Sequence, residues 1–436
     1  MTTSTESQDA KKKLPPGFGL AFGLTWLSYA SYYFGRKGLS VVKAPLMKEL
    51  GDDALLGVET AFLAAYAVGQ YLCGWLGDRI GSRRLIGVGM LVSAAACVLF
   101  GMSSLSIVFI IAFGLNGLAQ ASGWPGNIKA MAEWTTPQNR GAVMGFWATC
   151  YQVGGVAASA IAARILVVQA WPSFAPATGW RAAMVYPGVW VGVVGIAILL
   201  LLKQGPGLTS QPTSSDESQR DASSTESADK DALRKEAQRA VLRNPAVWSY
   251  GASYFFIKLI RYSLLFWLPF YLSSVLHYTH ENAGYMSTSF EIGGVVGTIA
   301  LGSLSDRYRQ LSRSMYSALS LVGLAGALLL YAQLGGTGEV ANFVAMAFVG
   351  ALLYGPDALL SGASAQDAGG PHGAAIAAGM VNGLGSLGAV LQELVTRGVS
   401  KRFGWDALFY TFVAMALLAA VALIPTFKRP AQPTSA

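Results

Sequence analysis

The stretch GWLGDRIGSRR, residues 74–84, ends one long apolar run of the sequence and begins the next. A second stretch, GSLSDRYRQLSR at residues 302–313, occupies the same place between two later apolar runs. In each, a glycine precedes an acidic-basic pair by four positions. A glycine lets two helices approach closely, and an aspartate is favoured beside the positive end of a neighbouring helix. We therefore expect gating contacts, which hold one conformation and release in another, at four residues: Asp78, Arg79, Asp306 and Arg307.

The two stretches belong to a longer internal repeat. Landmarks recur at an offset of 225 or 228 positions: Arg36 with Arg261, Asp78 with Asp306, and Gly179-Trp180 with Gly404-Trp405. A loop that only anchors the positively charged side of a membrane protein would explain the arginines. It would not explain an aspartate at the same place twice. The pattern predicts a duplicated unit.

The composition is that of a membrane protein. Of 436 residues, 53% are hydrophobic and 12% are charged, whereas soluble domains carry about 25% charged residues. This excludes a disordered chain and argues against a soluble enzyme. Hydropathy predicts about twelve stretches that are long enough to cross a bilayer as helices: 17–42, 55–77, 84–104, 106–133, 139–169, 180–203, 246–277, 282–305, 313–333, 341–364, 372–400 and 405–427.

These stretches fall into two sets of six, separated by a segment rich in Ser, Thr, Asp and Glu that is too polar to form a core. Lys and Arg are concentrated in loops on the side of the N-terminus, which places both termini and this linker in the cytosol. The first apolar run is too long for a cleaved signal peptide. The expected organisation is a tail at 1–16, a bundle at 17–203, a linker at 204–245, a bundle at 246–427 and a tail at 428–436.

Several kinds of partner are not expected. The net charge of +8 does not indicate nucleic acid, because much of the positive charge lies in short loops between apolar runs. Cys73, Cys97 and Cys150 lack the spacing of a metal site, and we expect neither a metal nor a cofactor. No P-loop and no nucleophile with a partnered histidine is present in the sequence, so we expect neither an ATP-driven pump nor an enzyme.

Twelve predicted helices in two halves, with the pattern G-x-x-x-D-R-x-G-x-R-R after the second, resemble the major facilitator superfamily. The resemblance extends from about Phe18 to Thr426. It implies an all-α integral membrane protein with two pseudo-symmetric six-helix bundles.

Charged residues inside the predicted spans are candidate functional residues, because each costs about 2.5–3.5 kcal/mol at the bilayer centre. The basic ones outnumber the acidic ones, which indicates an anionic ligand. The basic set is Arg36, Lys37, Lys43, Lys129, Lys258 and Arg261, and the acidic set is Glu291, Asp357 and Glu393.

Helical spacing groups these charges. Tyr29, Tyr33, Arg36 and Lys43 share one face of the first helix, and Lys258 and Arg261 share one face of the seventh. The duplication would bring the two arginines together across the pseudo-two-fold axis, near the midplane where substrates of such folds bind. Two guanidinium groups suit a tetrahedral oxyanion, because each donates parallel hydrogen bonds. An empty site would keep two repelling charges and reorient slowly, which would enforce exchange.

Other interpretations of the charges remain open. The arginines could instead pair with carboxylates and hold the bundle together. Lys37 could pair with Glu291, and Lys129 with Asp357 or Glu393. Either of the last two acids could also bind a coupling proton.

The residues also resemble a narrower family, the organophosphate:phosphate antiporters. SYASYYFGRKGLSVVK at 28–43 is similar to the first helix of bacterial glycerol-3-phosphate and hexose-phosphate transporters and of eukaryotic sugar-phosphate exchangers. YFFIKLIRYSLLFWLPFYL at 254–272 resembles the seventh helix of both branches. Gly123-Trp124-Pro125, NRGAVMGFW at 139–147 and Gly355-Pro356 are similar as well.

This resemblance implies residue roles. Arg36 and Arg261 would hold the phosphoryl group, with Lys258 at a lysine position of the eukaryotic branch, and Lys37 would bridge to Glu291 in one state. The cavity would be lined by Tyr29, Tyr33 and Trp124, with Tyr151 where the bacterial glycerol-3-phosphate transporter has a histidine. Gln70 replaces a lysine of that transporter, and Asp357 stands at a position that is usually apolar. These departures from the family leave open which organic group the protein binds and how its transport is coupled.

The predicted function is a secondary transporter that exchanges an organic phosphate, such as glucose-6-phosphate or glycerol-3-phosphate, for inorganic phosphate by alternating access. Its expected setting is the lipid bilayer of a bacterial inner membrane, where it would act as a monomer. Two alternatives remain. One is a membrane sensor of sugar phosphates, and the other is a proton-coupled carrier of an organic anion.

Overall fold

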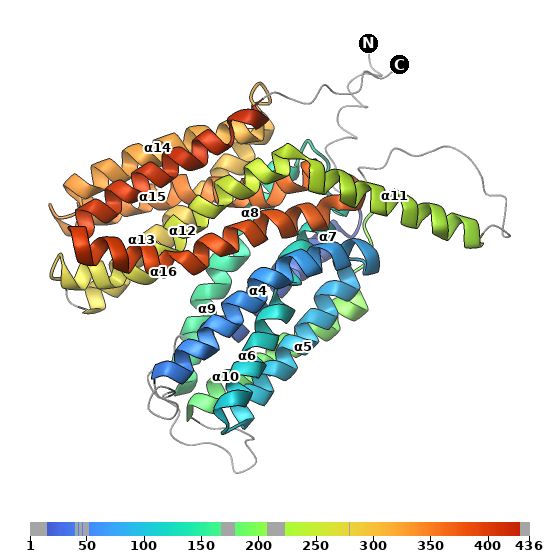
Figure 1. Cartoon of the computed structure of the whole chain (residues 1–436), viewed down its shortest axis with the longest axis horizontal. Coiled ribbons are helices and arrows are strands. Elements are labelled where there is room, and N and C mark those ends of the chain that lie inside the picture. Colours follow the sequence, from blue (N-terminus) through green and yellow to red (C-terminus); the bar gives the residue numbers. More distant parts are fainter. Residues whose placement is uncertain are drawn as a thin grey trace.

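The computed structural model of the chain describes residues 15–39, 42, 46, 52–166, 179–206, 223–278 and 280–427. Within these ranges all regular structure is helical (Figure 1). Six of the described segments are long and apolar enough to cross a membrane, judged by length and composition. Twelve membrane crossings and cytosolic termini stay predictions.

The helices form two groups, which Figure 1 shows in blue to green and in yellow to red. The N-terminal group contains α2 (Phe18–Tyr32), α4 (Asp52–Ile80), α5 (Ser82–Met102), α6 (Ser106–Gln120), α7 (Gly123–Trp134), α8 (Arg140–Trp147), α9 (Thr149–Leu166) and α10 (Gly179–Leu201). The C-terminal group, reached through α11 (Ser223–Arg243), contains α12 (Pro245–Ser274), α13 (His280–Arg307), α14 (Arg313–Leu334), α15 (Glu339–Ala358), a π-helical turn (Leu359–Ser364), α16 (Ala365–Ala422) and a final 3₁₀ turn (Ile424–Thr426).

Most predicted spans differ from the observed helices by a few residues, but several are broken or merged. The span predicted at 106–133 is divided into α6 and α7, and that at 139–169 into α8 and α9. The last three predicted spans run on from α15 through the π-helical turn into α16, which is interrupted by non-helical backbone at Gly370 and Gly404.

The repeated Gly-Trp pair has a backbone explanation. Gly179, the first residue of α10, has a φ of 57°, and Gly404, which interrupts α16, has a φ of 86°. These angles lie in the left-handed region that glycine adopts without a steric penalty. Gly370, with a φ of 60°, makes a third turn of this kind just before Pro371. The sequence repeat at these pairs therefore marks equivalent corners of the two groups.

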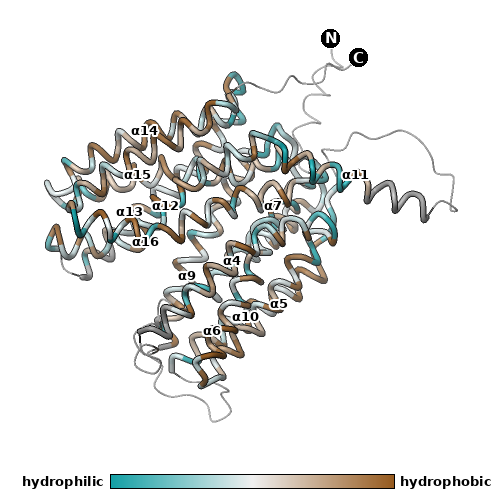
Figure 2. Tube along the Cα trace, viewed as in Figure 1, coloured by the Kyte–Doolittle hydropathy of each residue, from teal (hydrophilic) through white to brown (hydrophobic). Residues whose placement is uncertain are grey.

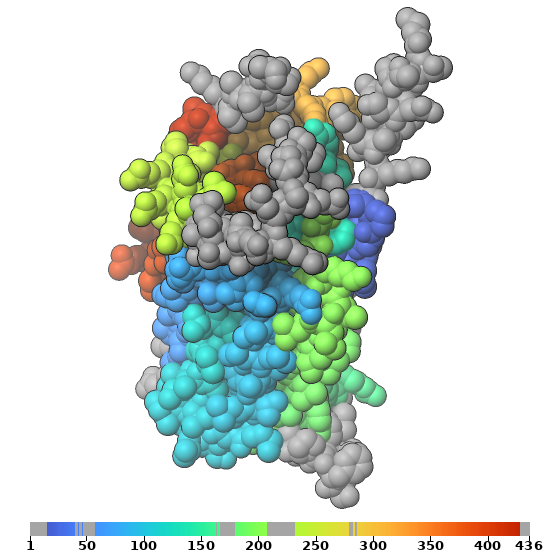
Figure 3. All heavy atoms as spheres, turned by 90° about the vertical axis from the view of Figure 1, so that its right-hand side faces the viewer, coloured from blue at the N-terminus to red at the C-terminus, as the bar shows by residue number. Residues whose placement is uncertain are grey.

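Hydrophobic residues occur along the helices of both groups (Figure 2), and many large apolar side chains are exposed. Leu200, Val344 and Leu394 are 70%, 62% and 71% exposed. Soluble monomers rarely expose large contiguous apolar patches, so this surface suits lipid. Figure 3 shows a face on which α5 and α10 lie side by side, and these two helices also pack against each other.

The two groups meet closely at glycines, where α4 packs against α16 and α8 against α13. A Cβ atom on Gly74 would lie 3.2 Å from the Cα atom of Gly379. A Cβ atom on Gly302 would lie 3.2 Å from the Cα atom of Gly145. Backbone therefore meets backbone at two equivalent places, which only small residues permit.

The two loop aspartates sit beside these glycine contacts, at what we call the aspartate end of the molecule. Asp78 accepts hydrogen bonds from the backbone N–H groups of Ala375 (3.3 Å) and Ile376 (3.1 Å), shortly after the turn at Gly370. Asp306 accepts one from the N–H of Ala142 (2.7 Å), in the first turn of α8. Each aspartate thus crosses to the N-terminal part of a helical segment of the other group, where the helix dipole favours a negative charge.

Lys129 forms an ion pair with a different acid from the two that were expected. Its Nζ atom lies 3.1 Å from Oδ1 of Asp78, and not beside Asp357 or Glu393. Because α7 runs toward the aspartate end, Lys129 reaches the carboxylate that is already bound to α16. The other two acids have different partners, described below. The predicted link between Lys129 and either of them was wrong.

The arginines of the two loops divide into exposed and buried ones. Arg79 and Arg307 are exposed and lie over the rings of neighbouring residues in their own loops. The connection between the groups instead runs from Arg140 to Asp367, from Asp367 to Arg313, and from Arg313 to Asp306. Arg140 and Asp367 were not among the predicted gating residues, because their pairing depends on how the two groups pack.

We expect the Asp306→Asn substitution to weaken this contact by about 1–3 kcal/mol, because it removes the charge from a largely buried hydrogen-bonded pair. The measurement is thermal unfolding of the purified protein in detergent, followed by tryptophan fluorescence. The unfolding temperature should fall, whereas Asp406→Asn, at an exposed position, should leave it unchanged. Equal unfolding temperatures for both variants would contradict a structural role for the Asp306 charge.

Candidate binding site

A cavity of about 70 Å³ lies between the two groups. The N-terminal group contributes Tyr33, Arg36 and Lys37 to its wall, and the C-terminal group contributes Arg261 and Glu291. A water molecule needs about 10–15 Å³ of such space, so the cavity can hold a small polar group. Both arginines that the repeat pairs thus face one site.

Arg36 is held by neutral groups. Its Nε atom donates to Oε1 of Gln120 at 3.1 Å. Its guanidinium carbon lies 5.1 Å from the ring centre of Tyr33, 5.6 Å from that of Phe62 and 4.8 Å from that of Tyr66. Aromatic faces stabilise a cation without neutralising it. Among the residues that the structure describes, no carboxylate lies within 4 Å of Arg36, so its positive charge remains available to a ligand.

Arg261 is held by a carboxylate. Its Nη1 atom lies 3.1 Å from both oxygens of Asp357. The hydroxyl of Tyr151 donates to the same carboxylate at 3.2 Å, and the rings of Tyr151 and Tyr354 lie 4.5 and 4.6 Å from the guanidinium carbon. The alternative in which an arginine pairs with an acid therefore holds for Arg261. The expectation of two uncompensated charges was wrong for this arginine.

Arg261 still has binding capacity on its other side. Its Nε atom is buried and has no hydrogen-bond partner among the described residues. Arg261 lines the cavity, whereas Asp357, which is fully buried, does not. The carboxylate therefore lies behind the arginine, and a ligand in the cavity can meet Arg261 from the front.

Lys258 lies one helical turn from Arg261 and points into a polar cluster. Its Nζ atom donates to Oδ1 of Asn382 at 2.6 Å and to Oγ of Ser386 at 3.3 Å. The amide of Asn382 in turn donates to Oε1 of Gln70 at 2.8 Å. Lys258 and Gln70 thus belong to one buried network, which borders the site through the ring of Tyr66.

The aromatic residues predicted to line the cavity occupy two layers. Tyr33 and Tyr151 line it. Tyr29 and Trp124 pack behind them, with ring centres 5.1 Å apart. The indole N–H of Trp124 donates to the carbonyl of Ser361 at 3.0 Å, across the interface between the groups. Trp124 therefore joins the two groups in this conformation.

Lys37 and Glu291 face the same cavity from opposite groups. In the described structure they do not approach within 4 Å as an ion pair, and the Lys37 ammonium lies 5.7 Å from the ring centre of Phe266. A bridge between them in another state stays a prediction. Lys43, predicted on the same face as Arg36, lies outside the described residues.

Gln152 is a site residue that the sequence reasoning missed. It lines the cavity and is 4% exposed, and in the part of the chain that the structure describes neither its amide nitrogen nor its amide oxygen has a hydrogen-bond partner. Buried amides are normally paired, so these atoms indicate a place for polar ligand groups. The available signal was a glutamine in an otherwise apolar run, next to Tyr151.

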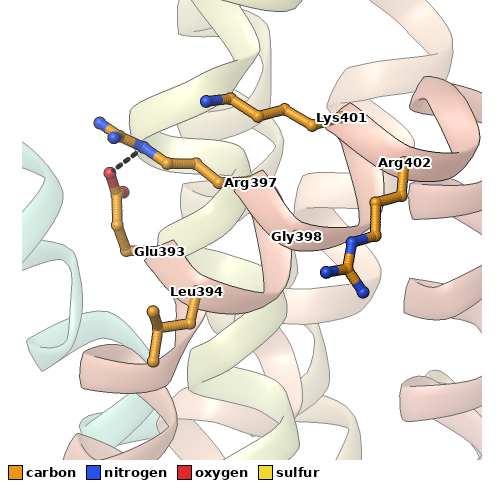
Figure 4. Close-up of a pocket in the computed structure, with 6 residues that line it drawn as sticks. All are labelled: Glu393, Leu394, Arg397, Gly398, Lys401 and Arg402. Atoms are coloured by element: carbon orange, nitrogen blue, oxygen red, sulfur yellow. Dashed lines mark ion pairs between the residues drawn. The ribbon is translucent and has the colours of Figure 1, made fainter.

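Glu393 lies away from this site. It lines a separate hollow of about 370 Å³ along α16, together with Leu394, Arg397, Gly398, Lys401 and Arg402 (Figure 4). It pairs with Arg397 at 2.7 Å and accepts a hydrogen bond from the indole of Trp267 at 3.2 Å. This placement does not support the predicted coupling role of Glu393.

The chain is similar to known membrane transporters over most of its length. A model described as Major Facilitator Superfamily matches residues 25–393. A putative glycerol-3-phosphate transporter from Arabidopsis thaliana is 30% identical over 93% of this chain and 90% of its own length. A glucose-6-phosphate exchanger from Bos taurus is 29% identical over 92% of each chain.

Solved structures share the fold at low sequence identity. The E. coli fucose:proton symporter matches with a TM-score of 0.70 and 11% identity, over 95% of this chain and all of its own. A proton:xylose symporter matches with a TM-score of 0.68 and 13% identity, over 93% and 94%. At such identities the likeness concerns the fold and not the substrate.

Proposed function

Because this chain belongs to the major facilitator superfamily, we propose that it is a secondary transporter that exchanges an organic phosphate for inorganic phosphate by alternating access. Relatives named as glycerol-3-phosphate transporters and glucose-6-phosphate exchangers, similar over nearly the whole chain, support the substrate class. They support sugar phosphates or glycerol phosphate as the organic substrates.

One observation carries this proposal: Arg36 and Arg261 enter one cavity from opposite groups. A phosphoryl group between them would accept hydrogen bonds from both guanidinium groups. At an effective dielectric constant near 20, one such charge pair at about 4 Å contributes roughly 4 kcal/mol. Binding in this place also links the two groups, so a ligand can influence their relative movement.

The organic part of the substrate would lie beside Gln152. Its unpaired amide can both donate to and accept from hydroxyl groups, which sugar and glycerol phosphates carry and inorganic phosphate does not offer at the same place. Tyr33 and Tyr151 also line this cavity and would offer apolar ring atoms to the carbon skeleton.

The proposed membrane topology rests on the hydropathy of the sequence and on the distribution of its Lys and Arg residues. Two six-helix bundles at 17–203 and 246–427 would cross a bacterial inner membrane twelve times, with tails at 1–16 and 428–436 and a linker at 204–245 in the cytosol. The aspartate end would then be the cytosolic end. The glycine and aspartate contacts hold the groups together at this end, so in the proposed topology the cytosolic side would be closed.

The test is exchange of radiolabelled inorganic phosphate in proteoliposomes loaded with unlabelled phosphate. We expect rapid exchange that is inhibited by a member of a panel containing glucose-6-phosphate, glycerol-3-phosphate and their unphosphorylated parents. The parent compounds should not inhibit. If the folded protein binds a sugar phosphate but exchanges nothing, the proposal fails and the protein is a sensor.

The Gln152→Leu substitution should separate the two substrates. Leucine fills a similar volume but cannot form hydrogen bonds, so we expect the sugar-phosphate concentration that half-inhibits exchange to rise about tenfold. Phosphate self-exchange should change far less. Equal effects on both ligands would show that Gln152 does not contact the organic part.

A further inference from the structure

The pair formed by Arg261 and Asp357 makes the two halves of the site electrically unequal. Asp357 places both oxygens 3.1 Å from one nitrogen of Arg261 and accepts a third hydrogen bond from Tyr151. Arg36, its counterpart by the repeat, contacts the neutral amide of Gln120 and three aromatic rings. Among the residues that the structure describes, one arginine of the empty site is therefore paired with a carboxylate and the other is not.

The difference in pairing between the two arginines affects how readily the empty protein changes from one conformation to the other. In alternating access, an empty transporter returns only if its unoccupied site can be closed off from water during the movement. Closing the site around an uncompensated buried charge is unfavourable, and the ligand's negative charge removes this cost. Asp357 supplies part of the same negative charge from within the chain, and its carboxylate lies behind Arg261 and away from the cavity.

We propose that Asp357 is a built-in counter-anion for Arg261 that allows the empty protein to reorient, so that the protein also performs net transport of its substrate without a counter-substrate. This inference rests on the proposed transport of phosphate compounds. It adds a second activity, net flux, to exchange, and it assigns that activity to one carboxylate.

The test compares two rates in proteoliposomes that contain radiolabelled inorganic phosphate. Exchange is efflux into medium with unlabelled phosphate, and net transport is efflux into medium without any phosphate compound. We expect the wild type to show both. In Asp357→Asn, the ratio of net efflux to exchange should fall by about tenfold or more, because neither arginine of the site would then be paired with a carboxylate during reorientation without ligand.

Glu393→Gln is the matched control. It also removes one carboxylate from the membrane region, but Glu393 pairs with Arg397 outside the cavity and is 43% exposed at its side chain. Its ratio should equal that of the wild type. An unchanged ratio in Asp357→Asn would overturn the proposal. So would net efflux that follows an imposed pH gradient in the wild type and not in Asp357→Asn, because Asp357 would then carry a proton.

A binding measurement separates this proposal from the proposed function. The unfolding temperature in detergent is measured with and without saturating inorganic phosphate. Phosphate should raise it more in Asp357→Asn than in the wild type, because the variant leaves Arg261 unpaired until the anion binds. If the wild type transports nothing, the proposed function fails. Equal phosphate-induced shifts in the two proteins would then overturn the role of Asp357, and a larger shift in the variant would support it.

Discussion

Proteoliposomes containing Arg36→Lys are expected to exchange phosphate about 100-fold more slowly than the wild type, or not at all. Lysine keeps the positive charge but loses the planar set of donors that can bind Gln120 and a phosphoryl group together. Arg36 also lies against three aromatic rings, and these fit a flat guanidinium better than an ammonium group. The measurement is the initial rate of labelled-phosphate exchange at equal reconstituted protein.

Arg261→Lys should be similarly inactive, because Arg261 must contact Asp357 behind it and the ligand in front of it. Arg397→Lys is the control, since Arg397 lies on α16 outside the cavity and is 57% exposed. Exchange above about a tenth of the wild-type rate in both site variants would show that charge alone suffices and that bidentate hydrogen bonding is not used.

Replacing Gly302 by valine is expected to reduce exchange to a comparable extent by a different route. A Cβ atom at this position would lie 2.4 Å from the carbonyl oxygen of Gly141, so the two groups cannot approach as they do here. Loss of this close contact should prevent closure at the aspartate end, and alternating access then stops. Gly74→Val should behave in the same way, because its Cβ atom would meet the backbone of α16.

Gly326→Val is the matched control for this prediction. Gly326 lies on α14, and a Cβ atom there would meet nothing within 4 Å. Closure can be followed with a cysteine in place of the buried Ser305, in a protein whose three native cysteines are replaced by serine. In the Gly74→Val background this cysteine should react with a water-soluble maleimide, and in the Gly326→Val background it should stay protected. Protection in both would show that the valine is accommodated without opening.

The helices and the paired landmarks could be predicted from the sequence because they depend on local patterns. Apolar runs located α4, α5, α10, α12 and α14 to within a few residues. The offset of 225 positions linked Arg36 with Arg261, and both line one cavity. Helix breaks such as that between α8 and α9 were missed, because an apolar run does not reveal where its helix bends.

Contacts between the two groups could not be predicted in the same way. The partner of Lys129 is set by the direction in which α7 meets α4 and α16, and the sequence does not encode this locally. The partner of Arg261 was one of several acids in the spans. Only the packing of α15 beside α12 places Asp357 there. Gln152 was missed because its importance lies in hydrogen bonds that the protein leaves unmade.

The arrangement of the two arginines also bears on the history of the chain. The two predicted repeats keep the same residue types at the aspartate end, where Gly74 and Asp78 correspond to Gly302 and Asp306. They have diverged at the centre, where one arginine faces an amide and the other a carboxylate. A repeated unit of this kind can therefore keep its contacts between the two groups while the charges at its centre change in one repeat.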